Sequence, residues 1–281
     1  MRFLNAYVYS NCNIALSTCC YTFVTYHTLV NQEYNFVVLA FVFLATLLSY
    51  TFHRLYPVIT KSIDSSESKI LQWTENNFEF IKWLFLATVI ILFLIFLQFA
   101  LEAKVLLICL AVISLFYGIP LIPFKHKVLK FRAIPFAKIF LIAFSFGMVC
   151  GVLPLLNADL HFAPSTYFIV FIEKFLYILA ITLPFDIRDL KHDKTINLKT
   201  IPLAIGVKPT IAIALILLLL SLATVLVFYQ LTFYAKCIYL FFYLISAILI
   251  FFSYKKRSDF YYLLFIDGLM ILPAILLTIL P

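Results

Sequence analysis

The 281-residue chain is too apolar to be a water-soluble domain. Hydrophobic residues make up 65% of it and charged residues only 12%, against roughly 25% charged residues in ordinary soluble domains. Its formal net charge of +8 would suit a nucleic-acid partner, but the cations are grouped in a few polar connections between long apolar segments. This grouping is typical of membrane topology. We therefore expect lipid as the solvent and no nucleic acid as a partner.

Segments long enough to cross a bilayer recur along the whole chain. A spanning helix needs about 20 mostly apolar residues. Runs such as Ile211 to Leu220 are apolar on every face, which argues against the alternating pattern of a membrane β-barrel. The sequence therefore predicts a single all-α domain over 1–281, a bundle of about nine transmembrane helices, at 9–28, 34–53, 82–100, 104–122, 134–156, 164–184, 209–230, 234–253 and 260–280.

The positive charges follow the connections after the second, fourth, sixth and eighth expected helices. Most of the 21 Lys and Arg residues lie there, within 54–82, 125–138, 188–208 and 255–257. Positive charge is retained on the cytoplasmic side during insertion, so we expect a multi-pass protein of the cytoplasmic membrane with a cytoplasmic amino terminus. The longer polar connections on this side are the expected place for chemistry. Within one of them, 64–80 reads either as an amphipathic helix at the membrane surface or as a solvated linker.

Three aspartates mark the connection that follows the sixth expected helix. Asp186, Asp189 and Asp193 are spaced i, i+3 and i+7, so on a helix they would project from one face. Their mutual repulsion would be offset by a divalent cation, and Mg²⁺ prefers a few carboxylates together with phosphate oxygens. The alternative is a solvated loop in which these acids pair with lysines of the same segment.

Cations flank the three acids. Arg188 and Lys191 lie in the same segment, and Lys125 and Arg132 are expected on the same side of the membrane. Carboxylates that hold a metal next to Arg and Lys are suited to a phosphate or diphosphate group.

The segment from Phe185 to Gly206, with its three aspartates and the run from Lys199 to Pro202, resembles the second Asp-rich motif of the UbiA superfamily of intramembrane prenyltransferases. The run from Tyr117 to Lys125, followed by Arg132, Gly147 and Gly151 to Pro154, is similar to the fourth and fifth helices of that family. The resemblance implies about nine helices and two Asp-rich motifs on the cytoplasmic side. It also implies Mg²⁺-dependent transfer of a prenyl group from a prenyl diphosphate to a lipophilic, often aromatic, acceptor among membrane lipids.

The resemblance assigns roles to particular residues. Asp186, Asp189 and Asp193 would be the metal ligands and catalytic residues. The substrate-binding residues would be Arg54, Tyr117, Lys125, Arg132, Arg188, Lys191 and Asp267.

The first Asp-rich motif of the family is altered in this chain. Where that motif carries its carboxylates, the run Ser49 to Pro57 places Tyr50 and His53, and Arg54 alone is suited to a diphosphate. One of the two usual metal sites is therefore in question. An alternative function is that of a family descendant that binds prenyl diphosphate or lipid without catalysis.

Three charged residues fall deep inside expected spans, away from the ends. Intramembrane acids are costly and usually face a cavity or a partner, so Asp267 is expected to line a cavity or to form a structural salt bridge. Glu173 and Lys174 are adjacent and would point about 100° apart on a helix, so we expect that they do not both face one partner. A transporter with Asp267 and Glu173 on an ion path is a further alternative, although no matching pair of broken helices is present.

Overall fold

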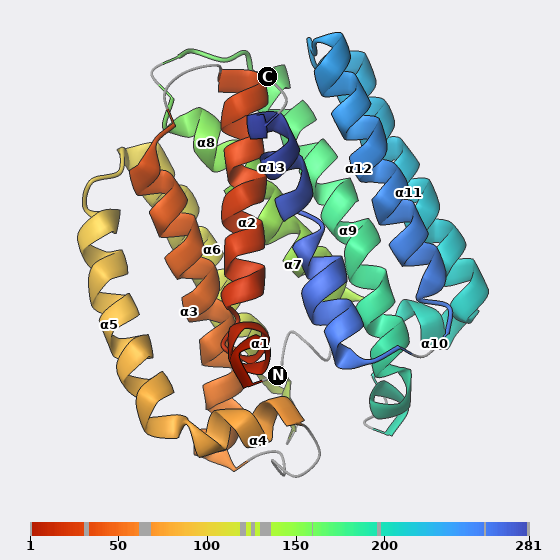
Figure 1. The fold of residues 1–281 in the computed structure, drawn as a ribbon. Coiled ribbons are helices and arrows are strands. Elements are labelled where there is room, and N and C mark those ends of the chain that lie inside the picture. The colour runs from red at the N-terminus through yellow and green to blue at the C-terminus, as the bar shows by residue number, and fades with distance from the viewer. Residues whose placement is uncertain are drawn as a thin grey trace.

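The computed structural model describes residues 2–30, 34–61, 69–118, 122–124, 127–129, 136–158, 160–195, 198–255 and 257–279. Long helices run side by side and form a bundle (Figure 1). Their order is α1 (Arg2–Tyr9), α2 (Cys12–Thr25), η1 (Tyr26–Val30), α3 (Phe36–Thr60), α4 (Lys69–Asn76), α5 (Phe78–Phe96), α6 (Leu101–Gly118), β1 (Ile122–Phe124), β2 (Lys127–Leu129), α7 (Ala137–Gly147), η4 (Met148–Val152), α8 (Leu153–Leu156), α9 (Pro164–Thr195), α10 (Ile201–Ile205), α11 (Val207–Phe228), α12 (Phe233–Phe252), η5 (Tyr261–Ile266) and α13 (Ile271–Ile279).

The expected all-α, multi-pass membrane fold is confirmed, and the number nine is approximate. Seven helices of the described residues are long and apolar enough to cross a membrane, by length and composition. The other two expected spans, 9–28 and 104–122, coincide with α2 continued by η1 and with α6. The short antiparallel hairpin β1–β2, with Ile122 opposite Leu129, was not predicted.

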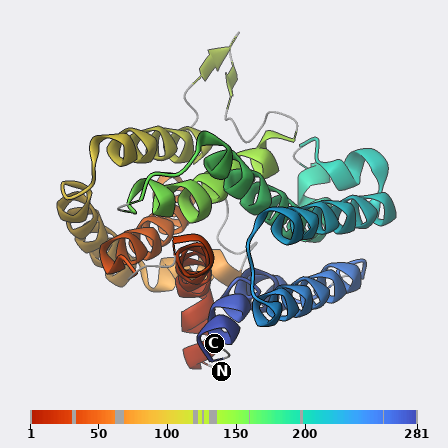
Figure 2. The same cartoon turned by 90° about the horizontal axis from the view of Figure 1, so that it is seen from above.

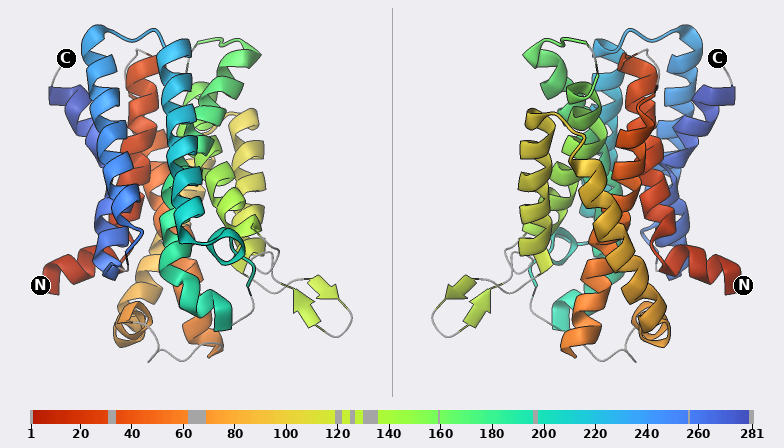
Figure 3. Two further views of the ribbon diagram at one scale, coloured as in Figure 1. Left: turned by 90° about the vertical axis from the view of Figure 1, so that its right-hand side faces the viewer. Right: turned by 90° about the vertical axis from the view of Figure 1, so that its left-hand side faces the viewer.

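The two ends of the bundle differ. The amino terminus lies at one end and the carboxyl terminus at the other, and α1, α10 and the hairpin lie at the amino-terminal end (Figure 3). The helix α4 crosses the same end (Figure 1). In its described part the segment 64–80 is helical, and Gln72 and Glu75 are exposed while Thr74 is buried, as in an amphipathic helix. Its location at the membrane surface stays a prediction. Seen from above, the hairpin projects away from the packed helices (Figure 2).

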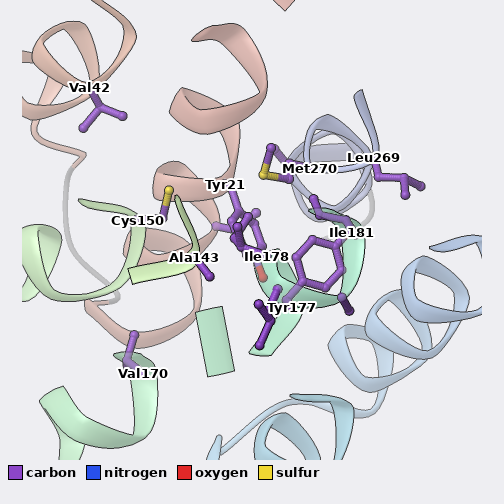
Figure 4. Packing of buried hydrophobic residues seen from close by; sticks show 14 of the residues in the cluster. Tyr21, Val42, Ala143, Cys150, Val170, Tyr177, Ile178, Ile181, Leu269 and Met270 are labelled. Atoms are coloured by element: carbon purple, nitrogen blue, oxygen red, sulfur yellow. The ribbon is translucent and has the colours of Figure 1, made fainter. Parts of the chain in front are cut away.

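Aromatic side chains fill the middle of the bundle. Tyr21 of α2 and Tyr177 of α9 are fully buried, with ring centroids 5.2 Å apart, and Phe242 of α12 lies 4.9 Å from Tyr177. Figure 4 shows Tyr21 and Tyr177 within this core.

Glycines bring the segment formed by α7 and η4 close to α9. A Cβ atom at Gly151 would lie 3.1 Å from Val170 Cγ1 and 3.2 Å from Lys174 Cγ, and one at Gly147 would lie 3.1 Å from the ring of Phe171. Small residues at helix contacts allow close backbone approach in membranes. This contact fixes the two helices that carry most of the site described below.

The expectation that Glu173 and Lys174 do not face one partner is wrong. Lys174 Nζ lies 3.1 Å from Glu173 Oε2 and 3.8 Å from the centroid of the Tyr21 ring. The Tyr21 hydroxyl donates to Glu173 Oε1 over 3.0 Å, and the Tyr243 and Tyr229 hydroxyls donate to the same carboxylate over 3.2 Å each. The two Cβ atoms do diverge, but the flexible lysine stem brings its ammonium group back over the tyrosine.

Candidate functional site

The site is built on the last turns of α9. The sixth span was expected to end at 184, but α9 continues to Thr195, so the aspartates lie on a helix and not in a loop. Asp186 is buried, with 2% of its surface exposed, and Asp189 is one turn further along. The helical face predicted from their spacing is present.

A lysine that sequence reasoning did not assign to the site lies against both acids. Lys138 Nζ, from the first turn of α7, donates to Asp186 Oδ1 over 2.8 Å and lies 3.8 Å from Asp189 Oδ2. In the sequence this residue counts only as one more cation near a connection. The close approach to α9 at Gly147 of α7 and Gly151 of η4 holds α7 beside α9 and so brings Lys138 near the two acids.

Arg188 completes the cationic side of the acids. Its Nε donates to Asp189 Oδ1 over 2.8 Å and its Nη2 to Oδ2 over 3.2 Å. The guanidinium carbon lies 5.1 Å from the centroid of the Phe185 ring and 5.5 Å from that of Tyr262. Arg188 Nη1 is buried and has no hydrogen-bond partner among the described residues. The N–H groups of this nitrogen are therefore not used by any described residue.

Arg54 and Asp267 approach from two other helices. Arg54, on α3, donates through Nη1 to the backbone carbonyl of Tyr9. It also interacts electrostatically with Asp267 and Arg188. Asp267, at the end of η5, interacts with both arginines. The altered first motif, the second motif and the last span therefore meet in one place.

The residues that replace the first-motif acids pack against Tyr117. The ring centroids of His53 and Tyr117 are 5.2 Å apart and their planes are inclined by 76°. Tyr117, at the end of α6, interacts electrostatically with both Tyr50 and Lys138. The predicted substrate-binding residue Tyr117 thus lies between the two motifs.

Other predicted site residues are less closely gathered or lie elsewhere. Lys191 is exposed. Asp193 is buried, and its backbone carbonyl accepts a hydrogen bond of 2.9 Å from Leu198 N. Lys125 and Arg132 lie outside the described residues.

The surroundings of the three aspartates determine whether they can form a metal centre. Among the described residues, no three His, Cys, Asp or Glu side chains are grouped so that they could hold a metal ion. The space between the carboxylates of Asp186 and Asp189 is bridged by the Lys138 ammonium. In this arrangement the described residues do not fit the expected three-aspartate Mg²⁺ centre.

A pocket opens beside Arg54, between α1, α3, α4 and α5. It is lined by Tyr9, Ser10, Asn11, Thr51, Arg54, Trp73, Thr74, Phe80, Ile81 and Leu84. Its lining is mixed aromatic and polar, and its space is that of about one water molecule.

No family model matches the sequence, and no curated protein matches it significantly. Solved structures do share the fold. A UbiA homolog from Archaeoglobus fulgidus is 15% identical, covers 96% of each chain and has a TM-score of 0.56. The same homolog bound to GPP and Mg²⁺ is also 15% identical, with 96% of this chain and 99% of that chain covered and a TM-score of 0.58.

A structure of digeranylgeranylglyceryl phosphate synthase is 13% identical to this chain. It covers 99% of this chain and 98% of its own, with a TM-score of 0.57. The likeness therefore extends over nearly the whole length of both chains, and the UbiA-like fold expected from the short motifs is confirmed.

Proposed function

We propose that this protein belongs to the UbiA superfamily as one domain over 1–281, and that it binds a prenyl diphosphate and transfers the prenyl group to a lipophilic acceptor. The observation that carries the proposal is the convergence of Arg54, Lys138 and Arg188 on one end of the bundle. The fold supports it, because a solved UbiA homolog with the same fold is bound to GPP. Lys125, Arg132 and Lys191 are proposed as further cations for the diphosphate, and Tyr117 and Asp267 as residues that line the substrate site.

The chemistry follows from where the charges lie. Guanidinium and ammonium groups donate charge-assisted hydrogen bonds to phosphate oxygens. When the allylic C–O bond breaks, its electron pair leaves with the diphosphate, and these cations stabilise the charge that develops there. The acceptor then supplies the electron pair of the new bond and releases a proton.

We propose that two aromatic rings stabilise the allylic cation. Phe185 and Tyr262 pack beside Arg188, and ring faces attract cations through their quadrupole. Apolar helices exclude water, which would otherwise capture the cation. An acceptor that is itself lipophilic can reach such a site from the membrane.

Dependence on Mg²⁺, with Asp186, Asp189 and Asp193 as ligands and catalytic residues, stays a prediction. It is supported by the Mg²⁺ bound in the similar UbiA homolog. The Lys138 bridge between two of these acids stands against it.

Binding without transfer is the second candidate, and one observation favours it. Tyr50 and His53 occupy the first-motif positions, and His53 packs against Tyr117. No observation favours a transporter, because Glu173 is bound by Lys174 and three tyrosines, and Asp267 lies between two arginines.

Radiolabelled geranyl diphosphate distinguishes these functions. The purified protein in lipid nanodiscs would be incubated with the label and a lipid extract as the acceptor source, with Mg²⁺ present. We expect bound label and a prenylated product that partitions into organic solvent. Binding without product would support the second candidate, and the absence of both would refute the proposal. Lys194→Ala, which removes an exposed lysine of α9, is the matched control for Arg188→Ala.

A further inference from the structure

The position of Lys138 between two aspartates has a chemical meaning beyond a stabilising ion pair. Its side chain is 15% exposed, and those of Asp186 and Asp189 are 3% and 25% exposed. A cation held against two carboxylates at these distances performs the electrostatic task of a bound metal ion, since it offsets their mutual repulsion.

The backbone holds this lysine in place. α7 begins at Ala137, after Phe136 in the left-handed conformation with φ 63°, and Phe136 N donates to Lys199 O over 3.3 Å. The start of α7 is thus tied to the segment that follows α9. Gly147 and Gly151 bring the rest of the span close to α9. The Lys138 ammonium is therefore positioned by two attachments along the same helix pair.

Acids and cations alternate at the site. Asp186, Asp189 and Asp267 lie among Arg54, Lys138 and Arg188, and Asp259 also interacts with Arg188. The altered first motif is consistent with a reduced need for a divalent cation, because Tyr50 and His53 bring no carboxylates.

We infer that Lys138 takes the place of one metal ion in this site, so that a prenyl diphosphate binds here without Mg²⁺. The inference rests on the proposed function. The ammonium keeps its 2.8 Å hydrogen bond to Asp186 and exchanges the looser 3.8 Å contact with Asp189 for a diphosphate oxygen. Asp186 is then a positioning residue for Lys138.

The test is the affinity for geranyl diphosphate in excess EDTA and in Mg²⁺, measured on the full chain in nanodiscs. The parent protein should bind in both buffers with affinities within about threefold. Lys138→Met should lose about 10- to 100-fold in EDTA, which corresponds to one charge-assisted hydrogen bond. Mg²⁺ should restore most of the loss, because the variant lacks the ammonium group beside Asp186 and a divalent cation can offset the charge of the two carboxylates in its place.

Lys194→Met is the matched control, because it removes the same charge from an exposed position on α9. It should bind like the parent protein in both buffers. Binding by the parent that disappears in EDTA would overturn the inference and leave the proposed function standing. Unchanged affinity of a folded Lys138→Met protein in EDTA would also overturn it. No binding in either buffer would refute both, and the measurement on the parent does not depend on whether the variant folds.

Discussion

Replacing Glu173 by Gln should destabilise the bundle more than most single substitutions. The amide keeps the shape of the side chain but removes the charge 3.1 Å from the Lys174 ammonium, whose side chain is 1% exposed. A buried charge left without its partner costs about 3–5 kcal/mol. The three tyrosine hydroxyls lose a charged acceptor, which adds to this cost at about 0.6 kcal/mol for each bond inside a membrane.

The assay is equilibrium unfolding in mixed micelles, followed by near-ultraviolet circular dichroism. Tyr229→Phe is the control for the loss of one hydroxyl and should cost under about 1 kcal/mol. The double variant Glu173→Gln with Lys174→Met carries neither charge, so it should recover most of the lost stability. The reasoning is refuted if Glu173→Gln costs no more than Tyr229→Phe, or if the double variant is less stable than Glu173→Gln.

Three further predictions concern the site, the helix contact and the topology. Arg54→Ala should lower the affinity for geranyl diphosphate about tenfold or more, since a hydrogen bond to a charged group is worth about 1.5–3 kcal/mol. The control Lys69→Ala, on the exposed face of α4, should leave the affinity unchanged. Equal affinities of the two variants would remove Arg54 from the site. Gly151→Val should lower stability by about 1–3 kcal/mol through overpacking against α9. Gly268→Ala, whose nearest neighbour would be 3.8 Å away, should have little effect, and equal melting temperatures for the two variants would contradict the close contact. In a cysteine-free background, Lys194→Cys should react with a membrane-impermeant reagent only from the cytoplasmic side, and His161→Cys should react only from the other side. Labelling of both residues from the same side would disprove the topology.

Much of the fold could be predicted because the bilayer simplifies the problem. A span must be about 20 apolar residues long, and its backbone must be hydrogen-bonded internally, so hydropathy alone locates α5, α11 and α12 within a few residues. It also locates the starts of α3 and α9, but not their ends. Hydropathy does not show where a helix ends beyond the membrane. For this reason the sequence predicted a connection, and not a helix, for the polar end of α9 from Phe185 to Thr195.

The site was only half predictable, for a related reason. Asp186, Asp189 and Arg188 are close in sequence, so helical spacing places them on one surface. Lys138 and Asp186 are 48 residues apart, and their contact depends on the crossing of α7 and α9. The glycines that permit this crossing are visible in the sequence, but the helix that they pack against is not.

The length of α9 has a consequence for the energy of substrate capture. Its 32 residues extend about 48 Å at 1.5 Å per residue, whereas the hydrocarbon layer is about 30 Å thick. Asp186 lies 22 residues after Pro164, hence about 33 Å along the helix axis. If α9 enters the hydrocarbon layer at Pro164 and crosses it without tilt, Asp186 lies just past the opposite boundary. A prenyl diphosphate could therefore keep its anionic group at the depth of the lipid phosphates while its hydrocarbon chain stays among the acyl chains. Binding would then require no transfer of charge into the hydrocarbon layer. The substrate would enter the site by lateral diffusion in the membrane plane, without a change of depth.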